Sequence, residues 1–181
     1  ERDILKYDMT FNFIFGGRVI GKTYSTLKYL IDNKIRFIYI RTYQTEVDLS
    51  ATPETNPFKR INTDMGCDYH FNKINKDVTG IYDTYNVLVG YAVALSTFAK
   101  VRGVDFSDID FILYEEFNTS IRPLKAQGEL FCNMYETINR NRELIGENPV
   151  KVVCLGNALT IGNPIMSTFN LVTDCEMMLK Y

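Results

Sequence analysis

The sequence predicts an α/β domain of three layers, built around a mainly parallel central sheet that carries an antiparallel extension. Two observations support this prediction. Strongly apolar runs, the pattern of strands buried on both faces, occur in both halves of the chain together with segments of helical spacing. Between them lie shorter segments separated by turn-forming residues, which is typical of antiparallel strands.

The first part of the chain predicts a strand–helix–strand unit. Residues Thr10–Phe15 are largely apolar and end at two glycines, so we expect a buried strand followed by a turn. Residues Lys22–Asn33 carry aliphatic side chains at helical spacing, and Ile35–Tyr43 is rich in β-branched and aromatic residues. A strand, a helix and a strand within about 30 residues form the βαβ unit of a parallel sheet.

The middle of the chain predicts a different local structure. Residues Ala51–Asp64 contain two prolines among threonines and asparagines, which indicates a loop or a short irregular helix. Residues Cys67–Asn72, Val78–Tyr82 and Asn86–Leu95 resemble successive antiparallel strands, with polar turn residues between them.

Three further elements complete the predicted domain. Residues Ile109–Tyr114 form another apolar strand, and Leu124–Ile138 places large apolar side chains on one helical face. Residues Val150–Leu155 form the last strong strand, which leads into Gly156 and Asn157.

Length and composition limit the class of protein. The chain has 181 residues, 46% of them hydrophobic, and this predicts one globular domain with a sizeable core. We expect no membrane partner, because no run reaches the roughly 18 apolar residues of a membrane span, and the charged residues at the start do not resemble a signal peptide. Four cysteines without a C-x-x-C pair and a single histidine argue against a zinc site of usual spacing.

The glycine turn after the first strand fits the phosphate-loop pattern G-x-x-x-x-G-K-S/T. Such a loop holds phosphates with its backbone N–H groups, and the positive end of the following helix dipole points at the same anion. Lys22 is expected to reach the β- and γ-phosphates of a nucleotide, and the Thr23 hydroxyl to coordinate Mg²⁺. A glycine-rich structural turn is the alternative. The expected nucleotide-binding residues are Gly16, Gly17, Arg18, Gly21, Lys22, Thr23 and Tyr24.

A second acidic element is expected on a neighbouring strand, and Phe111–Phe117 supplies one. Glu115 would hold Mg²⁺, through water, and Glu116 would polarise the water that attacks the γ-phosphate. The usual first acid is aspartate, and here it is glutamate. Asp110 is a poor substitute, because it lies about 16 Å away at the opposite end of the strand. A solvated strand end is the alternative.

Other polar residues are candidates for supporting roles. Asn157, at the carboxyl end of the last strand, is placed to sense the γ-phosphate, although a turn-forming asparagine is equally compatible. Arg140 and Arg142 close the long helix, and Arg102 precedes the acidic strand. Each basic cluster either carries an arginine that completes a neighbouring subunit's site, or is a charged helix end or a solvated loop.

Taken together, these residues resemble the DNA-packaging motor ATPases of the small protein-primed tailed phages. That family belongs to the ring-forming P-loop ATPases with an additional catalytic glutamate. The resembling segments are residues 11–24, 36–43, 111–117, 135–143 and 153–174. The arginine-rich helix end and the last of these segments are more specific than the phosphate loop, which many families share.

The resemblance implies a RecA-like P-loop NTPase fold of the additional-strand type, with residues 1–181 forming one ATPase domain. It implies an enzyme that hydrolyses ATP with Mg²⁺ and drives double-stranded DNA into a procapsid. The expected partners are this DNA, further copies of the chain in a ring of five, and the procapsid portal. The expected location is the host cytoplasm and transiently the portal vertex, but not the mature virion. The family's C-terminal nuclease-like DNA-binding domain is not within the sequence.

The resemblance also assigns roles to single residues. Glu116 matches the family's catalytic glutamate, and Glu115 stands where the family carries aspartate. Arg140 matches the arginine that acts in trans. Arg102 falls near a second trans-acting position, where the family residue resembles lysine, and Arg142 is a third candidate.

Two other functions are considered. A small-molecule kinase would need an arginine-rich lid, which the sequence lacks, and a partition-type nucleotide switch would not depend on Glu116 for turnover. The net charge of −2 and a pI of about 5.5 predict weak DNA binding by this chain, through local patches around Lys59, Lys73 and Lys100.

Overall fold

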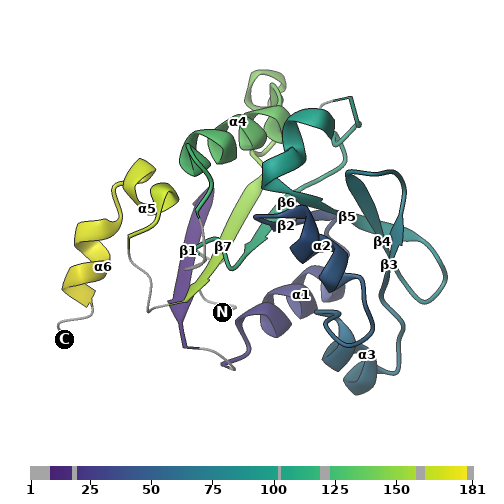
Figure 1. The fold of residues 1–181 in the computed structure, drawn as a ribbon. Coiled ribbons are helices and arrows are strands. Elements are labelled where there is room, and N and C mark those ends of the chain that lie inside the picture. Colours follow the sequence, from purple (N-terminus) through teal and green to yellow (C-terminus); the bar gives the residue numbers. More distant parts are fainter. Residues whose placement is uncertain (1–8, 18–19, 102, 119–122, 158–161, 179–181) are drawn as a thin grey trace.

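A computed structural model describes residues 9–17, 20–101, 103–118, 123–157 and 162–178. A seven-stranded sheet forms the middle layer, with helices on both of its faces (Figure 1). In chain order the elements are β1 (Phe11–Gly16), α1 (Lys22–Asp32), β2 (Phe37–Arg41), α2 (Gln44–Ser50), α3 (Lys59–Met65), β3 (His70–Lys73), β4 (Val78–Tyr82), β5 (Leu88–Ala94), the 3-10 helix η2 (Leu95–Val101), β6 (Phe111–Glu115), α4 (Gln127–Asn139), the 3-10 helix η3 (Arg142–Ile145), β7 (Lys151–Asn157), α5 (Pro164–Thr168) and α6 (Val172–Met178).

The strands lie in the order β1-β7-β6-β2-β5-β4-β3. The strands β1, β7, β6, β2 and β5 are parallel to one another. Strands β4 and β3 continue the sheet in antiparallel pairing. The predicted mainly parallel sheet with an antiparallel extension is therefore confirmed. The acidic strand was expected directly beside the strand that precedes the glycine turn. In the structure the acidic strand β6 is not the direct neighbour of β1, because β7 lies between them.

Two apolar cores, one on each face of the sheet, explain why the central strands are apolar throughout. Along β6, Ile112 and Tyr114 point into the core under α4 and α5, while Phe111 and Leu113 point into the core under α1, α2 and α3. Parallel strands covered by helices on both faces show this continuous apolar pattern instead of alternation.

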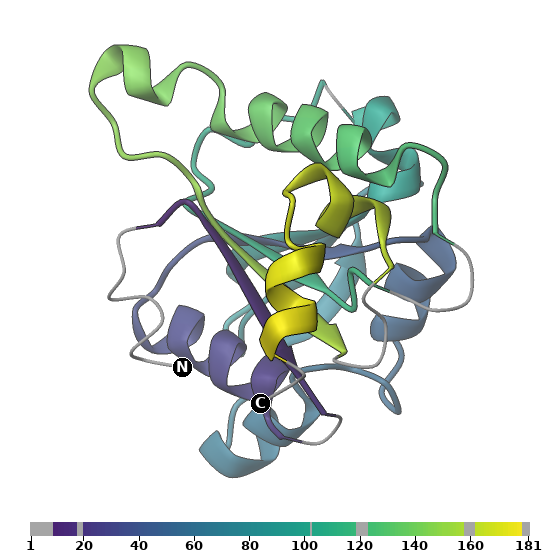
Figure 2. The same ribbon diagram turned by 90° about the vertical axis from the view of Figure 1, so that its left-hand side faces the viewer.

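The carboxyl-terminal helices cover the edge strand β1. Figure 2 shows α5 and α6 beside β1, with α4 above them. The ring of Phe169, which follows α5, lies 5.0 Å from the ring of Phe11 and 5.1 Å from that of Phe13. Aromatic contacts of this kind bury the face of a strand that would otherwise be exposed.

The main difference from the sequence prediction lies between β2 and β3. Residues 59–65 form the regular helix α3, where a loop or irregular helix was expected, and α2 was not predicted. The Glu46 side chain accepts a hydrogen bond from the Tyr43 backbone N–H and so caps the start of α2. Both helices are only 7 residues long, too short for a clear helical periodicity.

Three absences concern only the part of the chain that the structure describes. None of its helices is long and apolar enough to cross a membrane. Within the same ranges the four cysteines are free thiols, and no group of three or more histidine, cysteine or acidic side chains is arranged to hold a metal ion.

Candidate functional site

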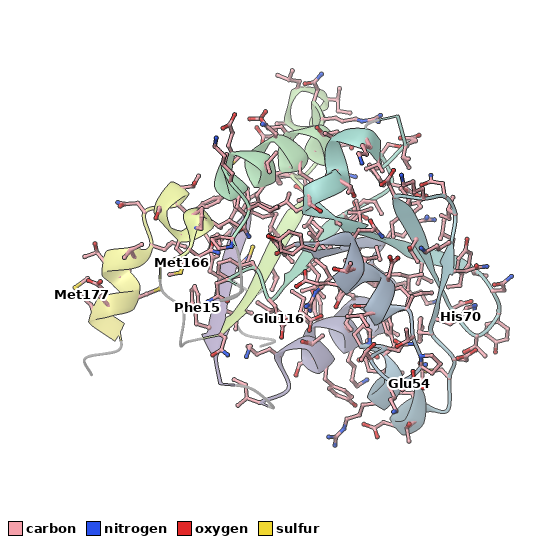
Figure 3. All side chains as sticks on the ribbon, viewed as in Figure 1. Phe15, Glu54, His70, Glu116, Met166 and Met177 are labelled. Atoms are coloured by element: carbon pink, nitrogen blue, oxygen red, sulfur yellow. The ribbon has the colours of Figure 1, made fainter. Side chains whose placement is uncertain are left out.

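The glycine turn that fits the phosphate-loop pattern and the acidic strand meet at one cavity of about 650 Å³. It lies at the carboxyl ends of β1, β7 and β6, the edge where open α/β sheets bind ligands. In Figure 3, Glu116 lies between Phe15, near the end of β1, and helix α1. The cavity is lined by Gly16, Ile20, Gly21, Lys22, Thr23, Tyr24, Arg60, Asp64, Glu115, Glu116, Leu155, Gly156 and Asn157.

Gly21 sets the point at which the loop becomes helix α1. Its φ of 82° lies in the left-handed region that favours glycine, and its carbonyl accepts the first helical hydrogen bond, from Ser25 N–H at 2.9 Å. The Lys22 ammonium folds back and donates to the carbonyls of Gly16 at 3.0 Å and Gly17 at 2.8 Å. The loop thus places a positive charge and a helix N-terminus on the cavity, which is a favourable arrangement for an anion. Arg18 lies outside the described residues.

Thr23 and Glu115 bring the two motifs into direct contact. The Thr23 hydroxyl donates a hydrogen bond to Glu115 Oε1, and the Tyr39 hydroxyl donates one to Glu115 Oε2. Burial, together with the charge of Glu115, raises the pKa of Tyr39 well above its ordinary value, so this hydroxyl stays protonated as a donor. A hydroxyl and a carboxylate side by side are oxygen ligands of the kind that Mg²⁺ prefers, and a Mg²⁺ ion bound there would complete its shell with water or substrate oxygens.

Arg41, at the carboxyl end of β2, joins both glutamates. Its Nη2 lies 2.7 Å from Glu116 Oε2, and its Nη1 lies 3.4 Å from Glu115 Oε2. Its side chain is only 14% exposed, whereas that of Glu116 is 63% exposed. Burial alone would lower the pKa of Arg41, but the electrostatic influence of Tyr39, Glu115 and Glu116 outweighs it and raises that pKa above its ordinary value.

Arg41 and Tyr39 were not predicted from the sequence as residues of the site. Both lie on β2, and Arg41 is the residue at which this apolar strand ends. A charged residue at the carboxyl end of a parallel strand next to the acidic strand was the signal that could have identified it.

The backbone at the end of β7 is held by Asn118. The Asn118 side chain donates to the Asn157 carbonyl at 2.7 Å and accepts from the Asn157 N–H at 2.9 Å. A Cβ atom on Gly156 would lie 2.8 Å from the Phe117 ring, so glycine is needed for this close approach. Asn157 lines the cavity, and Asn118, which was not singled out from the sequence, holds the backbone of Asn157.

The arginines after α4 lie away from this cavity. Arg142 is nearly buried: its Nη1 lies 3.0 Å from Asp110 Oδ1, and its Nη2 donates to the carbonyls of Ser107 at 2.7 Å and Ile109 at 2.8 Å. Because Asp110 precedes β6 and Glu115 ends it, Arg142 lies at the opposite edge of the sheet. The structure therefore gives Arg142 a role within its own chain.

Arg140 keeps a more accessible guanidinium. Its side chain is 48% exposed and lies 3.4 Å from Asp105 Oδ1, and it does not line its own chain's cavity. Arg102 lies outside the described residues. Of the expected basic patches, Lys59 is exposed on α3, and Lys73 lies 3.0 Å from Asp48.

The chain is similar to phage proteins over almost all of its length. The profile of the Podovirus DNA encapsidation protein (Gp16) family matches residues 1–180. The DNA packaging protein of Bacillus phage phi29 is 29% identical over 94% of this chain, and that of Bacillus phage B103 is 28% identical over 94%. These alignments cover 49% and 51% of the two relatives, so the chain spans about half the length of the curated relatives it matches.

Solved structures support the same similarity. The crystal structure of the N-terminal domain of the DNA packaging ATPase from bacteriophage phi29 superposes with a TM-score of 0.71 at 26% identity, covering 94% of this chain and 84% of that domain. A chain of the bacteriophage phi29 viral genome packaging motor assembly also gives 0.71, at 27% identity, covering 97% of this chain and 51% of that one. The mixed α/β fold with its mostly parallel sheet is thus that of a phage packaging ATPase N-terminal domain.

Proposed function

Since the chain belongs to the Podovirus DNA encapsidation protein (Gp16) family, we propose that it is the ATP-hydrolysing domain of a phage DNA-packaging motor. The observation that carries this proposal is the contact between Thr23 and Glu115 at one cavity. These residues are 92 positions apart, and the proposal needs both at the same Mg²⁺ ion. The strand order supports a RecA-like P-loop NTPase of the additional-strand type, because β7 is inserted between the strand of the loop and the strand of the acids.

The substrate in this proposal is ATP, with its phosphates at the N-terminus of α1. The Lys22 ammonium would exchange the Gly16 and Gly17 carbonyls for phosphate oxygens, which are stronger partners because they carry full charge. The Thr23 hydroxyl and the Glu115 carboxylate would hold Mg²⁺, which when bound adds positive charge against the phosphate oxygens. Tyr39 would keep Glu115 in place by its hydrogen bond.

Glu116 is the proposed general base. Its side chain is exposed to the cavity, and it can accept a proton from a water molecule that attacks the terminal phosphate. The ion pair with Arg41 sets the orientation of this carboxylate. Asn157 borders the same cavity and is the proposed sensor of the terminal phosphate.

Arg140 is the proposed trans-acting arginine. Arg140 is far from the phosphate loop in the sequence, and it does not line the cavity of its own chain. Its guanidinium is exposed, so a neighbouring subunit can reach it. An arginine supplied in trans stabilises the charge that develops during phosphoryl transfer. This requires further copies of the chain, which we propose to form a ring of five subunits.

The proposed partners of this ring are double-stranded DNA and the portal of a procapsid. The proposed location follows from these partners: the host cytoplasm, and the portal vertex while DNA enters. We further propose that residues 1–181 form one ATPase domain of a longer packaging protein. A near-neutral chain is expected to bind DNA weakly on its own, and a ring would multiply such contacts.

The exchange of Glu116 for glutamine tests this proposal. The substitution keeps the size of the side chain but removes the base, so ATP should still bind while turnover falls by about 10²–10⁴-fold. Glu54→Gln is the matched control, because Glu54 is also exposed but does not line the cavity. Unchanged turnover in Glu116→Gln would show that another group, or no group, acts as the base.

A further inference from the structure

One wall of the cavity is formed by three side chains that bind one another. Tyr24 comes from α1, and Arg60 and Asp64 come from α3. The Tyr24 hydroxyl donates to Asp64 Oδ2 at 3.0 Å, and Arg60 Nε lies 3.5 Å from the same oxygen. The Arg60 guanidinium carbon lies 5.8 Å from the centre of the Tyr24 ring. We name these three residues the α3 cluster.

The α3 cluster leaves polar atoms open to the cavity. Both of its contacts to Asp64 use Oδ2, and no donor from the described part of the chain reaches Oδ1. The two Nη groups of Arg60 likewise have no acceptor among the described residues, and the side chain is exposed. The hydrogen bond to Asp64 raises the pKa of Tyr24, so its hydroxyl stays protonated. This wall of the cavity therefore presents one hydrogen-bond acceptor, Asp64 Oδ1, next to the N–H donors of the planar Arg60 guanidinium.

Charge decides which part of a nucleotide fits against this wall. The charges of Arg60 and Asp64 offset each other, so the α3 cluster offers a phosphate no net attraction, whereas the Lys22 ammonium and the N-terminus of α1 attract it. The cavity, at about 650 Å³, is in the size range of sites for small ligands and extends beyond the loop. The uncharged end of a nucleotide, its base, is the part compatible with the α3 cluster.

We propose that the α3 cluster is the base-binding subsite and that it selects adenine by its amino group. The guanidinium of Arg60 and the ring of Tyr24 offer flat surfaces for a base. Adenine carries an N6 amino donor next to a ring-nitrogen acceptor, which complements Asp64 Oδ1 and an Arg60 N–H group. Inosine carries an oxygen in place of that amino group, and in the orientation proposed for adenine this oxygen would face the Asp64 carboxylate. The inference rests on the proposed function, because it assumes that the phosphate loop binds a nucleotide.

The test compares three ligands by calorimetry, each with Mg²⁺: ATP, inosine triphosphate, and inorganic tripolyphosphate, which has no base. The unmodified chain should bind ATP roughly tenfold more tightly than inosine triphosphate, as expected for one hydrogen bond to a charged group. In Asp64→Ala this preference should disappear through weaker ATP binding, and tripolyphosphate binding should not weaken. Arg60→Lys keeps the charge but loses the planar group, so it should weaken both nucleotides and leave tripolyphosphate unaffected.

Lys59→Ala is the control, because Lys59 is also on α3 but does not line the cavity. An unchanged preference for ATP in Asp64→Ala would overturn the inference, and so would an equal loss of affinity for ATP and tripolyphosphate. Equal affinity of the unmodified chain for ATP and inosine triphosphate would overturn it as well, while the proposed function stood. If the unmodified chain bound neither ATP nor tripolyphosphate, the proposed function itself would fail.

Discussion

Arg41 and Glu116 form an ion pair of 2.7 Å between Nη2 and Oε2, although 75 positions separate them in the chain. The pair links the carboxyl ends of the neighbouring strands β2 and β6. Arg41 also faces Glu115 and Glu46, so a single, largely but not fully buried guanidinium balances three carboxylates. The acidic side chains of the proposed catalytic centre therefore depend on a residue from the neighbouring strand β2.

We predict that Arg41→Ala lowers the free energy of unfolding by about 2 kcal/mol, because the nearly buried Glu115 carboxylate loses its cationic partner. Glu116→Gln should change stability by less than about 0.5 kcal/mol, because its side chain is largely exposed. Urea unfolding of both variants measures the difference. Equal stability of the two variants would mean that Arg41 does not hold the acidic centre together.

Stability should fall with rising pH above about pH 10, where tyrosines in the unfolded chain ionise. The pKa of Tyr39 is raised in the folded state, so its stabilising effect is complete below pH 10 and is lost as pH rises toward its folded pKa. Each such buried tyrosine adds up to about 1.4 kcal/mol per pH unit to this loss. Tyr39→Phe should make the decline between pH 10 and 11 shallower by about 1 kcal/mol, because the unfolded tyrosine is only partly ionised at pH 10.

Tyr85→Phe is the control for this pH profile, because the Tyr85 side chain is exposed. Its decline should match that of the unmodified chain, as followed by urea unfolding at each pH. A Tyr39→Phe profile that runs parallel to the control would contradict the assignment of the decline to Tyr39.

The two arginines after α4 should differ in their effect on folding. Arg142→Ala removes three polar contacts that join η3 to the segment before β6, and we predict a loss of about 3 kcal/mol. Arg140→Ala should cost less than about 1 kcal/mol, because its ion pair with Asp105 is exposed to solvent. Thermal unfolding of the two variants decides the ranking, and a larger loss in Arg140→Ala would reverse it.

Arg140 should instead affect ATP turnover at the site of a neighbouring subunit. If it acts in trans, the ATPase rate per chain should rise with protein concentration, and Arg140→Ala added to the unmodified chain should lower the rate by more than dilution predicts. Arg140→Lys is the matched variant, since it keeps the charge but not the planar group. A rate that depends neither on concentration nor on mixing would show that Arg140 does not complete a neighbour's site.

The local sequence was sufficient to predict the glycine turn before the first helix, the acidic strand and the positions of all seven strands. Each of these signals lies within a few consecutive residues: the spacing of Gly16, Gly21 and Lys22, or an apolar run that leads into Glu115. The loop pattern reflects backbone geometry, and the apolar run reflects burial of both faces of a strand. Both are properties of consecutive residues, so they can be read from the sequence. The helices α2 and α3 were missed or misjudged because 7 residues give too little periodicity.

Only the tertiary structure decided which residues surround these motifs. The strand order places β7 between β1 and β6 and puts β2 beside β6, so Tyr39 and Arg41 reach the glutamates. The packing of α3 against α1 brings Arg60 and Asp64 to Tyr24. No spacing along the chain contains this information, because contacts between distant segments follow from how the apolar faces of the sheet and helices pack together. The sequence alone determined what kinds of group the site contains, and the fold determined which partners hold them.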